Sequence, residues 1–177
     1  MRRRMPDSNN TAEDHRTRAE APAVTSRVLT LEERRLAASV FADAVDYDAV
    51  LIHRRKYWPL HPRRVTMAPD GHIWFHPLGA LHCEDFGAAS LALQGHFIHE
   101  MTHVWQAQRG GRFYLPLMRH PFCRYDYHFV PGKPFARYGI EQQAEIVRHA
   151  FLIRCGVIMP GKPPLNDYEA MLPFGKA

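Results

Sequence analysis

The sequence predicts an α+β fold in which two helices pack against a small antiparallel sheet. Residues 88–110 and 135–155 carry apolar side chains at helical spacing, and a glycine ends each stretch, as is common at helix C-termini. Residues 49–58 and 65–75 contain short apolar runs and a Pro-Asp-Gly turn, which indicates strands. We therefore expect one domain over residues 27–177, which is long enough to bury a core of its own.

The two ends of the chain are expected to contribute less to the core. The first 26 residues are polar and charged, so we expect a disordered basic tail that cannot bury enough apolar surface to fold. A helix is predicted over residues 31–45, because Thr30 and Glu33 have the spacing of a capping box at its start. The Pro-rich residues 163–177 are expected to wrap the surface.

Composition and charge exclude several classes of partner. The formal net charge of +5 is concentrated in five arginines among the first eighteen residues, so nucleic-acid binding is not expected. The chain lacks a run of about 18 apolar residues, so no membrane span is expected either. Three cysteines without paired spacing fit a reducing compartment. No apolar region follows the basic N-terminus as in a signal peptide, so we expect a cytoplasmic location, with non-classical export left open.

The strongest chemical signal is an H-E-x-x-H motif formed by His99, Glu100 and His103 inside the predicted helix 88–110. Residues four apart lie one turn apart on the same face, so both imidazoles can reach a single ion. Zinc accepts imidazole nitrogen and keeps one position open in catalytic sites. Glu100 follows the first histidine, where zinc peptidases place the carboxylate that takes a proton from water. The motif therefore predicts a Zn²⁺ site.

A third metal ligand must come from another part of the chain. Glu141 and Glu145 are four residues apart on the predicted helix 135–155, so they share one face. One carboxylate can bind zinc while the other accepts the N–H of a ligand histidine and fixes its orientation. The spacing leaves open which of the two binds the metal.

The H-E-x-x-H motif followed by Glu141 and Glu145 resembles the gluzincin-type zinc metallopeptidases. The resemblance covers residues 65–155. The same stretch is also similar to small bacterial proteins often labelled "Vgr-related". It implies a zincin-like fold, with Glu141 as third ligand and Glu145 supporting a ligand histidine. Many gluzincins have Asp at the position of Glu145, and the longer side chain leaves an exchange of the two roles open.

These residues predict a zinc-dependent hydrolase of peptide (amide) bonds that acts on a peptide or protein substrate. Glu100 is expected to take a proton from the attacking water and pass it to the leaving nitrogen. The oxyanion that forms needs a further donor, which we expect from the aromatic loop 112–136 or just after it. Tyr127 is the predicted catalytic donor, and the other candidates are Tyr125, Tyr138 and His128.

Two other functions fit the same residues. A catalytically inactive zinc-binding adaptor associated with a secretion system would need neither an open metal position nor Glu100. A hydrolase that acts on a cell-wall peptide and is exported as a toxin would use the same site as a peptidase. For either hydrolase, the strand at 72–75 is expected to lie at the edge of the cleft, where an extended substrate can pair with it.

Overall fold

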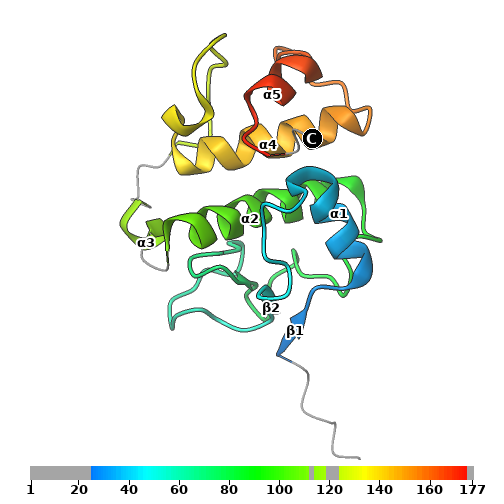
Figure 1. Ribbon diagram of the computed structural model, residues 1–177. Helices are drawn as coiled ribbons and strands as arrows, with labels where there is room; N and C mark the ends of the chain where they lie inside the picture. Colours follow the sequence, from blue (N-terminus) through cyan, green and yellow to red (C-terminus); the bar gives the residue numbers. More distant parts are fainter. Residues whose placement is uncertain (1–24, 112–113, 119–123, 175–177) are drawn as a thin grey trace, which may run out of the picture.

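The computed structural model describes residues 25–111, 114–118 and 124–174, and it is α+β as predicted (Figure 1). The predicted tail lies outside the described residues except for its last two positions, and Ser26 already belongs to a strand. The elements in chain order are β1 (Ser26–Val28), α1 (Leu31–Phe41), β2 (Leu51–His53), β3 (Ile73–Trp74), α2 (Leu91–Gly110), α3 (Tyr114–Met118), the 3-10 helix η1 (Phe135–Arg137), α4 (Ile140–Arg154) and α5 (Leu165–Met171).

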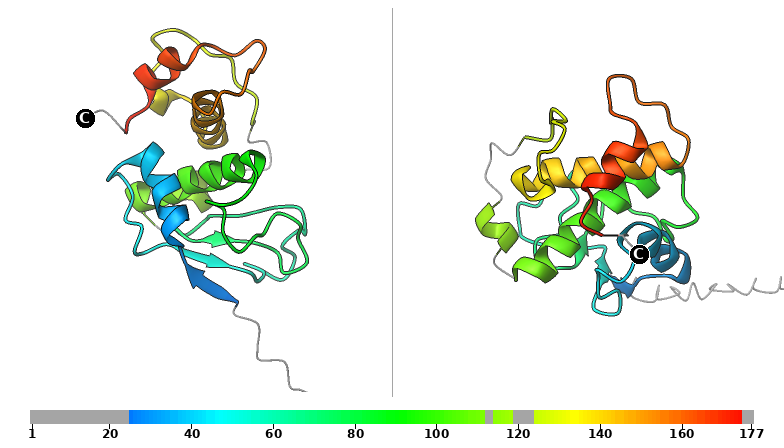
Figure 2. Two further views of the ribbon diagram at one scale, coloured as in Figure 1. Left: turned by 90° about the vertical axis from the view of Figure 1, so that its right-hand side faces the viewer. Right: turned by 45° about the horizontal axis from the view of Figure 1, so that its top comes forward.

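The longest helix, α2, lies in the middle of the molecule. Helices α4 and α5 lie on one side of it, and the sheet with its connecting loops lies on the other, as Figures 1 and 2 show. The helix that carries Glu141 therefore packs on α2 and not on the sheet, which corrects the predicted arrangement. Helical periodicity shows that a face is buried, but it does not identify the element that covers it.

The sheet is mixed, so the prediction of an antiparallel sheet is wrong in part. Strand β1 pairs antiparallel with β2, but β2 pairs parallel with β3, with Ile52 opposite Ile73. The predicted hairpin at 65–75 is reduced to one antiparallel bridge between Met67 and Trp74. Strand β3 is the outer strand of the three, and the segment around Met67 lies alongside it through this one bridge.

The capping box at the start of α1 is confirmed and extends into a larger network. The Thr30 hydroxyl accepts the Glu33 N–H at 3.0 Å, and a Glu33 carboxylate oxygen accepts the Thr30 N–H at 2.9 Å. Glu33 is fully buried, receives two bonds from Arg27 at 2.7 and 2.8 Å, and accepts the N–H of Phe86 at 3.0 Å. This one carboxylate joins β1, α1 and the loop before α2. The helix ends at Phe41, earlier than predicted, and Ala42 follows with φ of 49°.

Helices α2 and α4 approach each other closely at Gly95. A side chain at this position would bring a Cβ within 3.1 Å of Leu152 Cδ2 and 3.5 Å of Arg148 Nε. Glycine weakens a helix interior by roughly 0.5–1 kcal/mol relative to alanine, but here its missing side chain makes room for the neighbouring helix. The contact sets how near the histidines of α2 lie to the carboxylates of α4.

The C-terminal region is more helical than predicted. Helix α4 starts at Ile140, because residues 135–137 form η1 and Gly139 lies in extended conformation before the helix. Helix α5 lies within the stretch that was expected only to wrap the surface, and its Tyr168 is fully buried in the core. No helix in the described ranges combines the length and apolar character needed to cross a bilayer.

Candidate metal centre

Three potential metal-binding side chains meet between α2 and α4. His99 Nε2 and His103 Nε2 are 3.3 Å apart, and Glu141 Oε2 lies 3.4 and 3.1 Å from them, respectively. All three side chains are buried, with 6%, 4% and 1% of the residue surface exposed. The structure thus brings both motif histidines and one of the two predicted glutamates into a group that could hold a metal ion.

The spacing of these atoms fits one tetrahedral ion. Zinc binds nitrogen and oxygen ligands at about 2.0–2.2 Å, so two ligands of a tetrahedral site lie about 3.3–3.6 Å apart. The three observed separations of 3.1, 3.3 and 3.4 Å are close to this range. Two imidazole nitrogens and one carboxylate oxygen are also a donor set that zinc accepts in catalytic sites. Other divalent ions take the same donor types, so the geometry alone does not select zinc.

Gln106 fixes the orientation of His103. Its amide Nε2 donates to the Ile140 carbonyl at 3.1 Å and to Gln143 Oε1 at 2.9 Å, so its Oε1 accepts a proton from His103 Nδ1 at 2.8 Å. Because the proton of His103 is on Nδ1, the lone pair of Nε2 points toward the metal group. Gln106 lies three residues after His103 on the same helix, which predicts packing behind the metal, but its hydrogen bonds depend on residues 140 and 143 of α4.

Glu145 faces the other ring nitrogen of His99. Its Oε1 lies 2.9 Å from His99 Nδ1, so it takes the supporting position and leaves Nε2 to Glu141 and His103. Burial lowers the pKa of His99, but Glu141 and Glu145 outweigh burial and raise it to about 9. Burial raises the pKa of Glu145, but His99 and Arg148 lower it to about 2. Glu145 is therefore ionised at neutral pH, and a metal ion must displace a proton from His99.

A chain of polar contacts continues from Glu145 to helix α5. Glu145 Oε2 lies 3.3 Å from His149 Nε2, and His149 Nδ1 lies 2.6 Å from the Tyr127 hydroxyl. Tyr127 is in turn 2.6 Å from the Tyr168 hydroxyl. Burial lowers the pKa of His149 to about 4, so its ring is neutral near pH 7. Its Nε2 then carries the proton and faces Glu145, its Nδ1 accepts from Tyr127, and Tyr168 donates to Tyr127.

The other predicted catalytic residues differ in the groups that they contact. The Tyr127 hydroxyl is occupied by His149 and Tyr168, and the Tyr138 hydroxyl bonds the backbone of residues 128 and 130. Tyr125 lies nearer, with its ring stacked on His99 at a centroid distance of 6.2 Å. His128 is exposed. Sequence reasoning missed His149 and Tyr168, although His149 has the helical i+4 spacing from Glu145.

Glu100 is buried beside the motif histidines, with only 4% of its surface exposed. One carboxylate oxygen, Oε2, has no hydrogen-bond partner among the described residues, and Oε1 lies 3.9 Å from His96 Nε2. The His96 ring is held by the Thr66 hydroxyl at 2.8 Å. Because an ionised carboxylate is costly to bury without partners, this oxygen is a strong acceptor for a molecule that enters the site.

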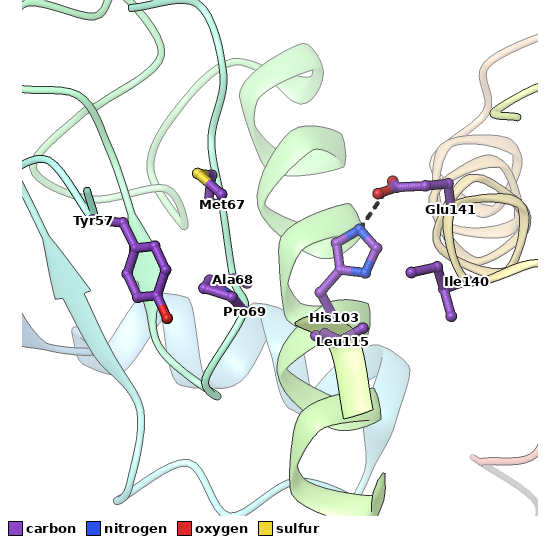
Figure 3. Close-up of a pocket in the computed structure, with 8 residues that line it drawn as sticks. All are labelled: Tyr57, Met67, Ala68, Pro69, His103, Leu115, Ile140 and Glu141. Atoms are coloured by element: carbon purple, nitrogen blue, oxygen red, sulfur yellow. Dashed lines mark hydrogen bonds and ion pairs between the residues drawn. The ribbon is translucent and has the colours of Figure 1, made fainter. Parts of the chain in front are cut away.

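A pocket of about 220 Å³ opens next to the metal group (Figure 3). His103 and Glu141 contribute its polar part. Figure 3 shows these two side chains on one side and Tyr57 across the pocket from them. The remaining wall is apolar and consists of Met67, Ala68, Pro69, Leu115 and Ile140. The pocket therefore connects the metal group to the edge of the sheet.

Comparison with known proteins shows a relative in a bacterial secretion system. The chain is 41% identical over 137 residues to the type VI secretion system spike protein VgrG2b of Pseudomonas aeruginosa, a match that spans 73% of this chain and 13% of that protein. The solved structure of the effector domain of Pseudomonas aeruginosa VgrG2b is similar, with a TM-score of 0.63 and 37% identity, over 78% of this chain and 80% of that chain. No family model matches the sequence.

Proposed function

Because the chain belongs to the family of the VgrG2b effector domain, we propose that it is a secretion-associated effector that hydrolyses peptide (amide) bonds with a bound zinc ion. The comparisons support the association with a secretion system, which the sequence analysis connected with an inactive adaptor. The hydrolase activity is proposed from the geometry of the site. The chain spans only 13% of the spike protein, so the activity and partners of the longer protein are proposals for this chain as well.

The observation that carries the proposal is the position of Glu100 next to the metal group. His99, His103 and Glu141 would hold the ion, and their buried side chains leave little freedom for other arrangements. When bound, zinc lowers the pKa of a water ligand and polarises a substrate carbonyl. Glu100 would take a proton from the attacking water through its unpartnered Oε2 and later deliver it to the leaving nitrogen.

Tyr125 is the better candidate for the donor that stabilises the oxyanion. Its ring stacks on His99, and half of the residue is exposed, so it lies close to the metal group and can be reached by a substrate. The hydroxyl of Tyr127 already bonds His149 and Tyr168. We therefore assign Tyr127 to the support of the site, in place of the catalytic role predicted from the sequence.

The test combines metal analysis with hydrolysis of a peptide library by the purified chain. Wild type is expected to bind about one zinc ion, and His103→Ala to lose it. Glu100→Gln should keep zinc but lose hydrolysis, because the amide cannot accept the proton. Glu169→Gln, an exposed change of the same chemistry on α5, serves as the control and should leave both properties unchanged.

Two results would contradict the proposal. Zinc retained by His103→Ala would remove the metal site, and an unchanged rate in Glu100→Gln would remove the general base. Zinc binding without hydrolysis of any peptide would favour the inactive adaptor.

A further inference from the structure

The pocket beside the metal group is apolar wherever it is not formed by metal-binding residues. Ala68 and Ile140 are buried, and Leu115 is 4% exposed. Among the described lining residues, the only polar side chains apart from the Tyr57 hydroxyl are His103 and Glu141. A charged substrate side chain placed there would lose its hydration without gaining a partner. The pocket therefore fits an aliphatic or aromatic side chain next to the bond that is cleaved.

The outer side of this pocket belongs to a strongly basic stretch of chain. Tyr57 lies within residues 54–64, here called the basic segment, whose five cations are all exposed and which contains no acidic residue. These cations are Arg54, Arg55, Lys56, Arg63 and Arg64.

None of the five cations forms an ion pair with any residue in the described part of the chain. Lys56 donates only to the Pro59 carbonyl at 3.2 Å, and Arg55 lies over the Trp74 ring at 4.9 Å. The arginines of the helices are different, since Arg34 pairs with Asp48 and Arg154 with Glu169. The basic segment thus carries positive charge that its own fold does not neutralise.

One contact and one neighbouring position place this charge beside the pocket. Arg55 lies over the ring of Trp74, whose backbone pairs with pocket residue Met67. Lys56 directly precedes pocket residue Tyr57 in the sequence. The Tyr57 N–H donates to His61 Nδ1 at 3.2 Å, and His61 Nε2 donates to the Val65 carbonyl at 2.7 Å, so the part of the basic segment that carries Arg63 and Arg64 is held next to Tyr57. A peptide that enters the pocket from this side must pass the uncompensated cations.

We infer that the cleft selects acidic peptides in which an apolar residue occupies the pocket and Glu or Asp residues next to it face the basic segment. This selectivity rests on the proposed function, because it assigns the pocket to a peptide held at the metal group. Exposed ion pairs are individually weak and screened by salt, so the acidic neighbours are expected to tune affinity while the apolar residue dominates it.

The test measures binding separately from hydrolysis. The zinc-loaded Glu100→Gln protein is titrated with labelled, end-blocked alanine hexapeptides in which one position is Leu, Phe, Asp or Lys and its neighbour is Glu, Gln or Lys. Peptides with Leu or Phe at the position that enters the pocket are expected to bind at least about tenfold more tightly than peptides with Asp or Lys there. Peptides with Glu at the neighbouring position are expected to bind about fivefold more tightly than peptides with Lys there, and this difference should shrink in 0.5 M salt.

Charge variants locate the acidic preference. Lys56→Gln/Arg63→Gln should lose the preference for Glu, whereas the control Arg35→Gln/Arg154→Gln removes the same charge from α1 and α4 and should retain it. Equal binding of Lys and Leu peptides, or a Glu preference that survives in Lys56→Gln/Arg63→Gln, would overturn the inference. Tighter binding of single-stranded DNA or phosphatidylserine vesicles than of any acidic peptide would also overturn it.

Hydrolysis distinguishes the two proposals. If the wild-type protein cleaves none of the peptides but the Glu100→Gln protein binds them with the expected order, the proposed activity fails and the binding preference stands. If wild type cleaves peptides without regard to either position, the activity stands and the inferred selectivity fails.

Discussion

Glu145→Gln tests whether the carboxylate behind His99 supports the metal site. Glu145 Oε1 lies 2.9 Å from His99 Nδ1, and its other oxygen lies 3.3 Å from His149. The amide keeps the shape but removes the negative charge that favours a correctly oriented His99. Loss of such a supporting group costs about 10–100-fold in metal affinity, which corresponds to about 1.4–2.7 kcal/mol. We expect about tenfold for Glu145→Gln and about 100-fold for Glu145→Ala.

The assay is competition for zinc with a chromophoric chelator at constant pH. Glu141→Gln is measured in parallel and should lose more affinity than Glu145→Gln, because it removes a ligand and not a supporting group. Glu169→Gln on α5 is the control and should bind zinc as wild type does. Wild-type affinity in Glu145→Gln would refute the supporting role. A larger loss in Glu145→Gln than in Glu141→Gln would exchange the roles of the two glutamates.

Three further predictions concern stability. Tyr127→Phe removes the hydroxyl between His149 and Tyr168, so urea unfolding should show a loss of about 1–3 kcal/mol, with zinc affinity reduced less than tenfold. A wild-type unfolding free energy would show that the two bonds contribute nothing. Glu33→Ala leaves Arg27 and two backbone N–H groups without their acceptor and should cost about 3–5 kcal/mol, whereas the exposed Glu32→Ala should cost less than about 0.5 kcal/mol. Similar losses in the two variants would contradict the network. Burial, helped by His72 and Arg55, lowers the pKa of His53 to about 4, so the unfolded chain takes up the proton first as the pH falls. The contribution of neutral His53 to the free energy of unfolding is complete above pH 6.5 and is lost as the pH falls toward 4. The free energy of unfolding of His53→Gln should therefore fall less steeply over that range than that of wild type. Parallel pH profiles would exclude this contribution.

The features predicted correctly from the sequence are those that depend on neighbours along the chain. Thr30 and Glu33 form a capping box because the signal needs only four consecutive positions. His99 and His103 share a helix face because their separation is one helical turn. The same spacing placed Glu141 and Glu145 on one face, but it did not distinguish their roles. That distinction depends on which nitrogen of His99 each carboxylate meets, which is a property of the packing of α4 on α2.

The features that were missed depend on contacts between distant parts of the chain. The parallel pairing of β2 with β3 requires the chain to return in the same direction, and strands of three and two residues carry too little pattern to show it. Gln106 gained its role from Ile140 and Gln143, which lie on another helix. From the sequence alone Gly95 is only a weak point in a predicted helix, and the reason for it is the nearness of Leu152 on α4.

Glu100 provides the main physical argument for an enzyme over an inactive zinc module. Glu100 is 4% exposed, and within the part of the chain that the structure describes one of its carboxylate oxygens has no hydrogen-bond partner. Burying such a group lowers stability, and an apolar residue of similar size would avoid the cost without disturbing His99, His103 or Glu141. Stability alone therefore does not explain Glu100 at this position. Proton transfer during hydrolysis does explain it, because that step needs a basic oxygen that no protein group already occupies.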